Sequence, residues 1–511
     1  MSARTYRGAP AGPGAGRRWS ASPLLVDDDV PGEIVRDVVE TRSSDEGDLL
    51  GVLVELNLTA GAVPGETLER FLVRHAGVLD APSSARPAPR PVAAAYVRCL
   101  LSRAEIRNLL RADDSAPPRT IFRIWPDYVM HAQVDRSIST IKADAAARTY
   151  GTTGAGIVWA VLDSGVDAEH PHFSCGTLTD PAVRDLHRDF TWLVRDDPPP
   201  PAQAPGPALI DEHGHGTHVA GIIAGAAPPD RPPHLAVLAP TTGDDGDLPR
   251  WTVRGLEPGR AVSGMAPLAR LVSLKVLDSA GGAARTTSSA VIEALEYVRT
   301  VNAGGRLLRI HGVNLSIGCP WFFRDYAAGQ SPLCRELDLL VGTGVVAVVS
   351  AGNGGYGSER GGGPHGVLSS ITDPGNADRV ITVGATHRDK PHTYGVSYLS
   401  SKGPTLDGRL KPDVLAPGER ITSCASGRFR AAIPALPAGR DAACYAEDSG
   451  TSMAAPHVSG AIAALLSVRP EFVGRPDDVK ELITTSAISL GRDRFFEGHG
   501  LVDLMGALAR I

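Results

Sequence analysis

Near its C-terminus the chain carries the stretch Ser449-Gly450-Thr451-Ser452-Met453-Ala454-Ala455-Pro456-His457. It opens a run of small and apolar residues that continues to Leu466, which predicts a buried helix with Ser452 at its N-terminal edge. Pro456 fits only the first turn of such a helix, where its missing N–H is not needed. The unpaired N–H groups and the positive end of the helix dipole favour an oxyanion formed beside Ser452. Ser452 is therefore a candidate nucleophile, although this segment alone fits an ordinary N-terminal helix serine equally well.

Length and composition describe an ordinary globular protein. The chain has 511 residues, enough for two or more domains, and 42% of them are hydrophobic and 21% charged. Its formal net charge of −6 is small for this size, so neither nucleic acid nor a membrane surface is indicated as a partner. No apolar run reaches transmembrane length; the nearest, Leu339 to Ala351, carries glycines and suits a buried strand better.

The N-terminal region has no apolar core of signal-peptide length. Residues 1–24 are rich in Gly, Pro, Ala and Arg, and we expect them to be disordered. A cytoplasmic location is predicted, with unconventional export left open. Six cysteines in a chain of this size do not make a disulfide scaffold, and in a reducing compartment free thiols are expected.

Residues 25–135 show the pattern of a small α+β domain. Strands are predicted at Leu49–Leu56, Ala94–Leu101 and Thr120–Trp125, a helix at Glu66–Val78, and a Pro-rich link at Ala81–Pro91. Ser102 and Glu105 form a capping box that opens a second helix, to Leu110. The boundary signals alone would suit any adaptor domain of about a hundred residues equally well.

From about residue 140 strands alternate with helices, which indicates an α/β fold: a mostly parallel central sheet with helices on both faces. Strands are predicted at Gly156–Leu162, Leu271–Leu277, Gly312–Ile317, Val345–Ser350 and Val380–Ala385, and helices at His215–Ala226, Ser288–Asn302, Glu336–Thr343 and after Ser452. Two Pro/Gly-rich insertions, Pro198–Ala208 and Ala227–Arg260, are expected to be surface loops. The second domain is thus predicted to span residues 140–511.

Three side chains predict the chemistry. Asp163 stands where an apolar strand ends before a glycine turn, and ligands of open parallel sheets gather at the carboxyl ends of strands. His215 begins a helix of small residues. A serine hydroxyl needs an imidazole to take its proton and a carboxylate to fix the imidazole tautomer. Asp163, His215 and Ser452 supply that set.

The segments Asp163-Ser164-Gly165, His215-Gly216-Thr217-His218 and Gly450 to His457 resemble, in this chain order, those of the subtilisin-like serine proteases. The resemblance covers roughly residues 140–511. It implies a subtilisin-like fold and an endopeptidase that hydrolyses peptide bonds through an acyl-enzyme. It selects the first histidine of the second motif as the base, so His213 and His218 are expected to pack or form hydrogen bonds locally, and Asp167 to be a turn residue.

The same resemblance implies an oxyanion site and a substrate groove. Asn353 would donate to the oxyanion together with the Ser452 N–H, although in isolation it also fits a turn asparagine with positive φ. The segment Ser316-Ile317-Gly318 resembles the edge strand that pairs with an extended peptide. Gly352 and Gly354 would border the pocket for the side chain before the cut bond, with an apolar or broad preference. Asn314 is compatible with a structural or a catalytic role.

The domain at residues 25–135 is similar in layout to the family's propeptide, a folding aid and inhibitor removed by self-cleavage. Cleavage is predicted between about residues 130 and 142, so this domain is an expected partner besides protein or peptide substrates. No cofactor is required by this chemistry, and no metal-ligating residue is assigned. The acidic loops at Gly243–Asp247 and Thr372–Pro374 could bind calcium, but solvated loops are favoured.

Other function classes remain open on the sequence alone. A noncatalytic relative could use the groove for peptide binding, but an intact triad argues against it. An esterase is disfavoured because the chain lacks the Gly-x-Ser-x-Gly elbow and its residue order. A protease that passes its acyl-enzyme to an amine, and so acts as a transpeptidase on a dedicated substrate, stays an alternative.

Overall fold

The computed structural model describes most of the chain after its N-terminal segment. The described residues are 49–57, 64–79, 88–93, 96–126, 137–195, 197, 205–231, 233–239, 250–256, 261–280, 284–319, 328–358, 364–439 and 442–511. The chain divides into two compact units, Met1–Met130 and His131–Ile511. The segment 1–24, predicted to be disordered, lies outside the described residues.

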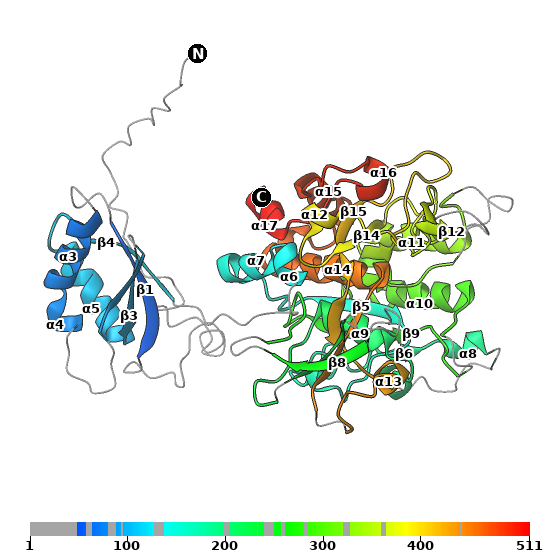
Figure 1. Cartoon of the computed structure of the whole chain (residues 1–511), viewed down its shortest axis with the longest axis horizontal. Helices are drawn as coiled ribbons and strands as arrows, with labels where there is room; N and C mark the ends of the chain where they lie inside the picture. The colour runs from blue at the N-terminus through cyan, green and yellow to red at the C-terminus, as the bar shows by residue number, and fades with distance from the viewer. Residues whose placement is uncertain are drawn as a thin grey trace, which may run out of the picture. The chain divides into compact units, whose positions relative to one another are not determined.

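The N-terminal unit is an antiparallel sheet with helices packed on one face (Figure 1). The strand order is β2-β3-β1-β4. The elements are β1 Leu50–Leu56, α3 Pro64–Arg74, α4 Ala76–Leu79, β2 Arg90–Ala93, β3 Tyr96–Leu101, α5 Arg103–Asp114 and β4 Ile121–Pro126. Alternate β1 residues Val52, Val54 and Leu56 are buried against Phe71 and its neighbours, as the period of a half-buried strand requires.

Two local details of this unit bear on the predictions. The capping box is confirmed: Ser102 Oγ accepts from Glu105 N at 3.2 Å, and Glu105 Oε2 accepts from Ser102 N at 2.8 Å. Strand β2, however, begins inside the segment predicted as a Pro-rich link. Pro91 is tolerated there because β2 is an edge strand, where the missing N–H costs no ladder hydrogen bond.

The second unit is built on a seven-stranded sheet whose neighbouring strands are all parallel (Figure 1). The order is β15-β14-β11-β10-β5-β9-β6. The strands are β5 Val158–Asp163, β6 Arg188–Asp189, β9 Arg270–Lys275, β10 Gly312–Leu315, β11 Val346–Ser350, β14 Ile381–His387 and β15 Val414–Glu419. The predicted α/β class is therefore confirmed, and β6 and β15 are additional to the predicted strands.

Helices cover both faces of this sheet. Trp159 and Val161 of β5 point into a core shared with α9 (His215–Ile223) and α14 (Thr451–Val468). The alternate residues of β5 point into a second core shared with α10 (Ser288–Val301) and α11 (Pro332–Gly342). The remaining helices are α6 Ser137–Thr140, α7 Ala143–Tyr150, α8 Thr191–Val194, α12 Pro391–Tyr394, α13 Gly427–Ala431, α15 Pro476–Ser486, α16 Arg494–Glu497 and α17 Leu504–Ala509.

The prediction that the insertion Ala227–Arg260 is a surface loop is wrong in part. It contains β7 (His234–Ala239) and β8 (Arg250–Gly255), which pair antiparallel. These strands extend a second sheet of order β16-β17-β7-β8, with β16 Ile421–Cys424 and β17 Cys444–Asp448. Strand β7 also pairs with β17, which lies about two hundred residues further along the chain, so the local Pro/Gly content does not indicate this pairing.

Helix α14 differs from its prediction at Pro456, which is the sixth residue of the helix and lies beyond the first turn. The lost backbone bond is replaced: the Ser452 carbonyl, four residues earlier, accepts from Ser316 Oγ at 2.9 Å. By length and composition α14 could cross a membrane, but 83% of it is buried within the protein. Its apolarity is accounted for by the core.

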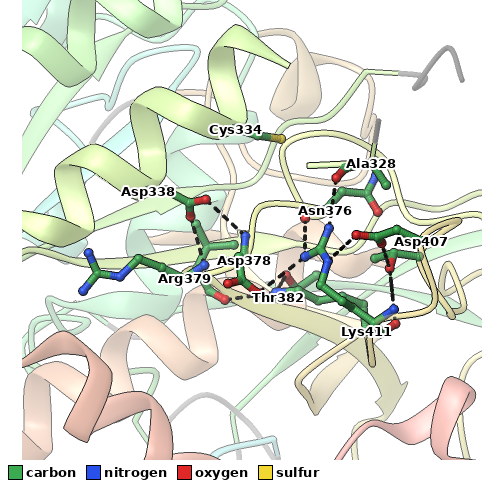
Figure 2. Close-up of polar contacts among 12 residues, drawn as sticks. Ala328, Cys334, Asp338, Asn376, Asp378, Arg379, Thr382, Asp407 and Lys411 are labelled. Atoms are coloured by element: carbon green, nitrogen blue, oxygen red, sulfur yellow. Dashed lines mark hydrogen bonds and ion pairs between the residues drawn. The ribbon is translucent and has the colours of Figure 1, made fainter. Parts of the chain in front are cut away.

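The turn before β14 is fixed by α11. Figure 2 shows the Asp338 carboxylate of α11 accepting hydrogen bonds from the backbone N–H groups of Asp378 and Arg379, at 3.4 and 2.9 Å. This contact ties the outer helix to the central sheet where the chain enters β14. All six cysteines are free thiols.

Candidate active site

Asp163 and His215 meet at the carboxyl end of the sheet. Asp163 is the last residue of β5 and only 1% exposed, and His215 is the first residue of α9. His215 Nδ1 lies 2.8 Å from Asp163 Oδ1. An imidazole with Nδ1–H bound to a carboxylate is held in the tautomer that leaves Nε2 free to accept a proton.

A second buried carboxylate, which the sequence analysis did not single out, holds this pair in place. Asp211 accepts hydrogen bonds from Gly214 N (2.8 Å), Thr217 N (2.8 Å) and Thr217 Oγ1 (2.6 Å) at the start of α9. It also accepts from Ser164 Oγ at 2.9 Å, and that hydroxyl accepts from Gly216 N. Asp211 therefore fixes the N-terminus of α9 against the residue that follows Asp163.

Ser452 is the second residue of α14, as predicted for the edge of a helix. Its hydroxyl donates to the Ser316 carbonyl at 3.1 Å. Among the described residues no hydrogen bond joins this hydroxyl to His215, so in this arrangement the serine is bound to the segment that is predicted to pair with substrate. Catalytic hydrogen bonds are often long or misaligned before substrate binds. A rotation about the Ser452 χ1 angle is what the chemistry requires.

Asn353 stands beside the N-terminus of α14. Its Oδ1 accepts from Thr451 N at 2.9 Å and from Thr451 Oγ1 at 3.0 Å. Because the oxygen is engaged, the amide Nδ2 must point the other way, and the side chain is exposed. A Cβ built on Gly450 would lie 3.3 Å from Nδ2, so the amide lies next to Gly450, two residues before Ser452. The Asn353 amide and the Ser452 N–H thus lie in one region.

The residues predicted to bind substrate lie on two segments next to Ser452. Strand β10 ends at Leu315, and the predicted edge Ser316-Ile317-Gly318 follows it, changing from buried through half-buried to exposed. On the other segment Gly352 N donates to Thr451 Oγ1 at 3.1 Å, and Gly354 is exposed.

Thr372 lies between these segments. Its Oγ1 would be 2.5 Å from a Cβ on Gly318 and 2.5 Å from a Cβ on Gly352. The threonine side chain therefore occupies the space between the two glycines, a feature that single motifs could not reveal.

Electrostatics favour a charged imidazole at His215. Burial by itself lowers its pKa, but the Asp163 carboxylate outweighs burial, with further help from Asp448 and Asp211. The pKa of His215 is therefore raised above its ordinary value. His218, three residues along α9, is fully buried, and burial lowers its pKa.

Three further residues near the site form local hydrogen bonds: His218, Asp167 and Asn314. His218 Nε2 lies 3.2 Å from the Ala446 carbonyl, a local hydrogen bond. Asp167 accepts from Glu169 N and from Ser426 Oγ, as a turn residue does. Asn314 is fully buried and joins β10 to α14: its Nδ2 donates to Ser316 Oγ at 3.0 Å and its Oδ1 accepts from Ser459 Oγ at 2.8 Å. Its role is thus to support Ser316.

Of the two acidic loops that could bind calcium, Gly243–Asp247 lies outside the described residues. In the other, Asp373 is 1% exposed, its Oδ1 accepts from Asn376 Nδ2 at 2.8 Å, and its Oδ2 has no hydrogen-bond partner among the described residues. Within the described part of the chain, no three His, Cys, Asp or Glu side chains gather as metal ligands.

The fold and these contacts define a serine hydrolase with an Asp–His pair at the carboxyl end of a central strand and a serine at a helix N-terminus. Residues 154–504 match the model of the Subtilase family, Peptidase_S8, and the chain belongs to this family. It is a subtilisin-like serine endopeptidase.

Curated relatives agree with this assignment. Serine protease AprX of Bacillus subtilis is 28% identical over 368 residues, covering 71% of this chain and 68% of the relative. Subtilisin E of Bacillus subtilis is 28% identical over 386 residues, covering 75% and 74%. Subtilisin DY of Bacillus licheniformis is 30% identical over 297 residues, covering 58% and 78%.

Proposed function

We propose that this endopeptidase cuts peptide bonds with Ser452 as nucleophile, His215 as general base and Asp163 as the group that orients His215. The observation that carries the proposal is the 2.8 Å contact between His215 Nδ1 and Asp163 Oδ1. It leaves Nε2 as the only ring atom able to take a proton from a serine hydroxyl.

The reaction follows from these positions. Ser452 Oγ leaves the Ser316 carbonyl, gives its proton to His215 Nε2 and attacks the peptide carbonyl carbon. The oxyanion accepts hydrogen bonds from Asn353 Nδ2 and the Ser452 N–H, at the positive end of the α14 dipole. His215 then protonates the leaving amine, and a water molecule, deprotonated by the same imidazole, releases the acyl group.

We further propose that an extended peptide pairs with Ser316-Ile317-Gly318 by strand addition. The support is that this segment follows β10 and leads from a buried to an exposed residue, and that the Ser316 carbonyl accepts a hydrogen bond from Ser452 Oγ.

An active-site probe tests the assignment of Ser452. A fluorophosphonate should label the wild-type protein and Ser467→Ala, a serine near the other end of α14, but not Ser452→Ala. Equal labelling of Ser452→Ala would overturn the assignment, and an unlabelled wild type would favour a noncatalytic peptide binder. Casein should be hydrolysed in preference to a short-chain ester, since the opposite result would indicate an esterase.

We also propose that the N-terminal unit inhibits this site until it is removed by self-cleavage. The support is its separate compact core and its layout of a four-stranded sheet with helices on one face.

A further inference from the structure

The loop that carries Asn353 is held by a second segment, residues 398–402. Gly355 N donates to the Leu399 carbonyl at 3.0 Å, and Ser401 N donates to the Gly352 carbonyl at 2.9 Å. Gly354 N donates to Ser401 Oγ at 3.0 Å. Every residue flanking Asn353 from 352 to 355 is thus bound to the same short segment.

Lys402 lies at the centre of this contact. Its side chain is 3% exposed, and its Nζ donates to three backbone carbonyls: Gly355 at 2.8 Å, Ser400 at 2.9 Å and Tyr398 at 3.0 Å. These use all three donors of an ammonium group. Within the described part of the chain, Lys402 forms no ion pair; the ring of Phe496 lies 5.3 Å from Nζ.

A buried ammonium without a carboxylate is costly, and burial lowers the pKa of Lys402. The chain has only six lysines against 45 arginines, so a basic residue at a given position is seldom lysine. A compact point charge with three donors suits three converging carbonyls. The ammonium bridges the Asn353 loop, through Gly355, and segment 398–402, through Tyr398 and Ser400.

We propose that Lys402 is a positioning residue for the oxyanion site: it holds the Asn353 loop on segment 398–402 so that the Asn353 amide faces the reacting carbonyl. This rests on the proposed role of Asn353. The loop needs such a clamp because Gly352, with φ +99, and Gly354 flank the asparagine and give the backbone little stiffness of its own. Without the ammonium, the carbonyls of Tyr398 and Ser400 would lose the hydrogen bonds that it donates, and the Gly355 carbonyl would keep only the bond from Val367 N.

The variant Lys402→Met removes the charge and keeps most of the side-chain length. We expect kcat to fall about 10- to 100-fold with KM changed less than about threefold, since a shift of about 1 Å in a catalytic group costs roughly a hundredfold. The sharper readout is a double-mutant cycle. In an Asn353→Ala background, Lys402→Met should lower kcat by less than about twofold, because the group that it positions is already absent.

Lys411→Met is the matched control. Lys411 is 2% exposed and its Nζ also donates to a backbone carbonyl, that of Val380 at 3.1 Å, and to Thr382 Oγ1 at 2.8 Å. Unlike Lys402, it also forms an ion pair, with Asp413 Oδ2 at 2.7 Å, and Figure 2 shows it beside Thr382. This variant should lower the melting temperature and leave kcat within about twofold of the wild type.

The outcomes separate the two proposals. If Asn353→Ala keeps the wild-type kcat, the role of the Asn353 amide is overturned. If Asn353→Ala is slow and Lys402→Met adds its full loss to it, only the role of Lys402 is overturned. An equal kcat loss in Lys411→Met would also overturn it.

A milder variant covers the case in which Lys402→Met does not fold. Ser401→Ala removes the acceptor of Gly354 N. It should lower kcat several-fold in the wild type and not in Asn353→Ala; equal losses in both backgrounds would overturn the proposal.

Discussion

At the scale of single residues, the Asp163–His215 pair sets the pH range of the enzyme. A general base works only when neutral, and Asp163 raises the pKa of His215. Activity is therefore lost as pH falls through a value above that of an ordinary histidine. In Asp163→Asn the opposing effect of burial remains and the attraction is gone, so the acid limb of kcat/KM should move to lower pH.

The kcat itself should fall by roughly ten-thousandfold in Asp163→Asn. Without the carboxylate, the imidazole is no longer held in the tautomer that can accept the serine proton. The pH–rate profile of wild type and variant measures both effects. An unchanged acid limb would show that a group other than His215 titrates there.

Also at the scale of single residues, the position of Thr372 predicts a limit on the size of the substrate side chain before the cut bond. Its side chain fills the space between Gly318, in the segment predicted to pair with an extended peptide, and Gly352, predicted to border the pocket for the side chain before the cut bond. The wild type should therefore prefer small residues at that position, which narrows the apolar or broad preference expected from the sequence.

Thr372→Gly should raise kcat/KM for peptides with Phe or Leu before the cut bond relative to Ala, by about 10-fold or more, because the pocket gains the volume of the lost side chain. Profiling with a peptide library checks it, with Thr252→Gly, at an exposed position of β8 in the other sheet, as control. A wild type that already favours Phe, or a variant with the same profile, would contradict this prediction.

At the scale of elements, α14 depends on close contact with its neighbours. A Cβ on Gly460 would lie 2.4 Å from Met265 Cβ and 3.1 Å from the carbonyl of Ile223, the last residue of α9. Gly460→Ala should lower the free energy of unfolding by about 1–3 kcal/mol through overpacking, despite the better helix propensity of alanine.

Gly342 provides the matched control for that change. It is the exposed last residue of α11, and its added Cβ would meet only the end of the Arg379 side chain, at 3.0 Å. Gly342→Ala should be neutral or stabilising by a few tenths of a kcal/mol. Denaturant unfolding of both variants measures the difference; equal stabilities would show that α14 can shift without loss.

The same scale shows what sequence can predict. The central strands were predictable because parallel strands buried on both faces read as continuous apolar runs, as in Val346–Ser350. Strands β7 and β8 were not, because their segment is rich in turn residues and is ordered by pairing with the distant β17. The position of Pro456 is not predictable from sequence, because only the tertiary contact between Ser316 Oγ and the Ser452 carbonyl makes a proline beyond the first turn acceptable.

For the site, motif residues could be placed on elements, but their supports could not. The sequence indicates Asp163, His215, Asn353 and Ser452 as single positions, and the family implies their roles. The contacts of Asp211 and Lys402 join segments that are far apart in the chain, and no local pattern marks such residues.

At the scale of the whole molecule, the catalytic unit contains everything from α6 onward. Ser137 and Ile141 are buried within it, and the Leu504 N–H of α17 donates to the Ile141 carbonyl at 3.1 Å. A peptide bond after Ser137 could be cut only if these buried residues were first pulled out of the catalytic unit. The N-terminal unit ends its last strand at Pro126. Self-cleavage should therefore occur between residues 126 and 137, an interval shifted toward the N-terminus from the 130–142 expected from sequence.

The purified wild type should thus lose its N-terminal unit and show a new N-terminus in that interval, whereas Ser452→Ala should stay at the full 53.4 kDa, because cleavage needs the nucleophile. Mass spectrometry and N-terminal sequencing measure both. Adding a trace of active enzyme to Ser452→Ala distinguishes cutting between molecules from cutting within one, since only the former restores processing. Full activity in a wild type that remains intact would contradict removal of the unit, and the N-terminal unit added back to processed enzyme should inhibit it in proportion to its concentration.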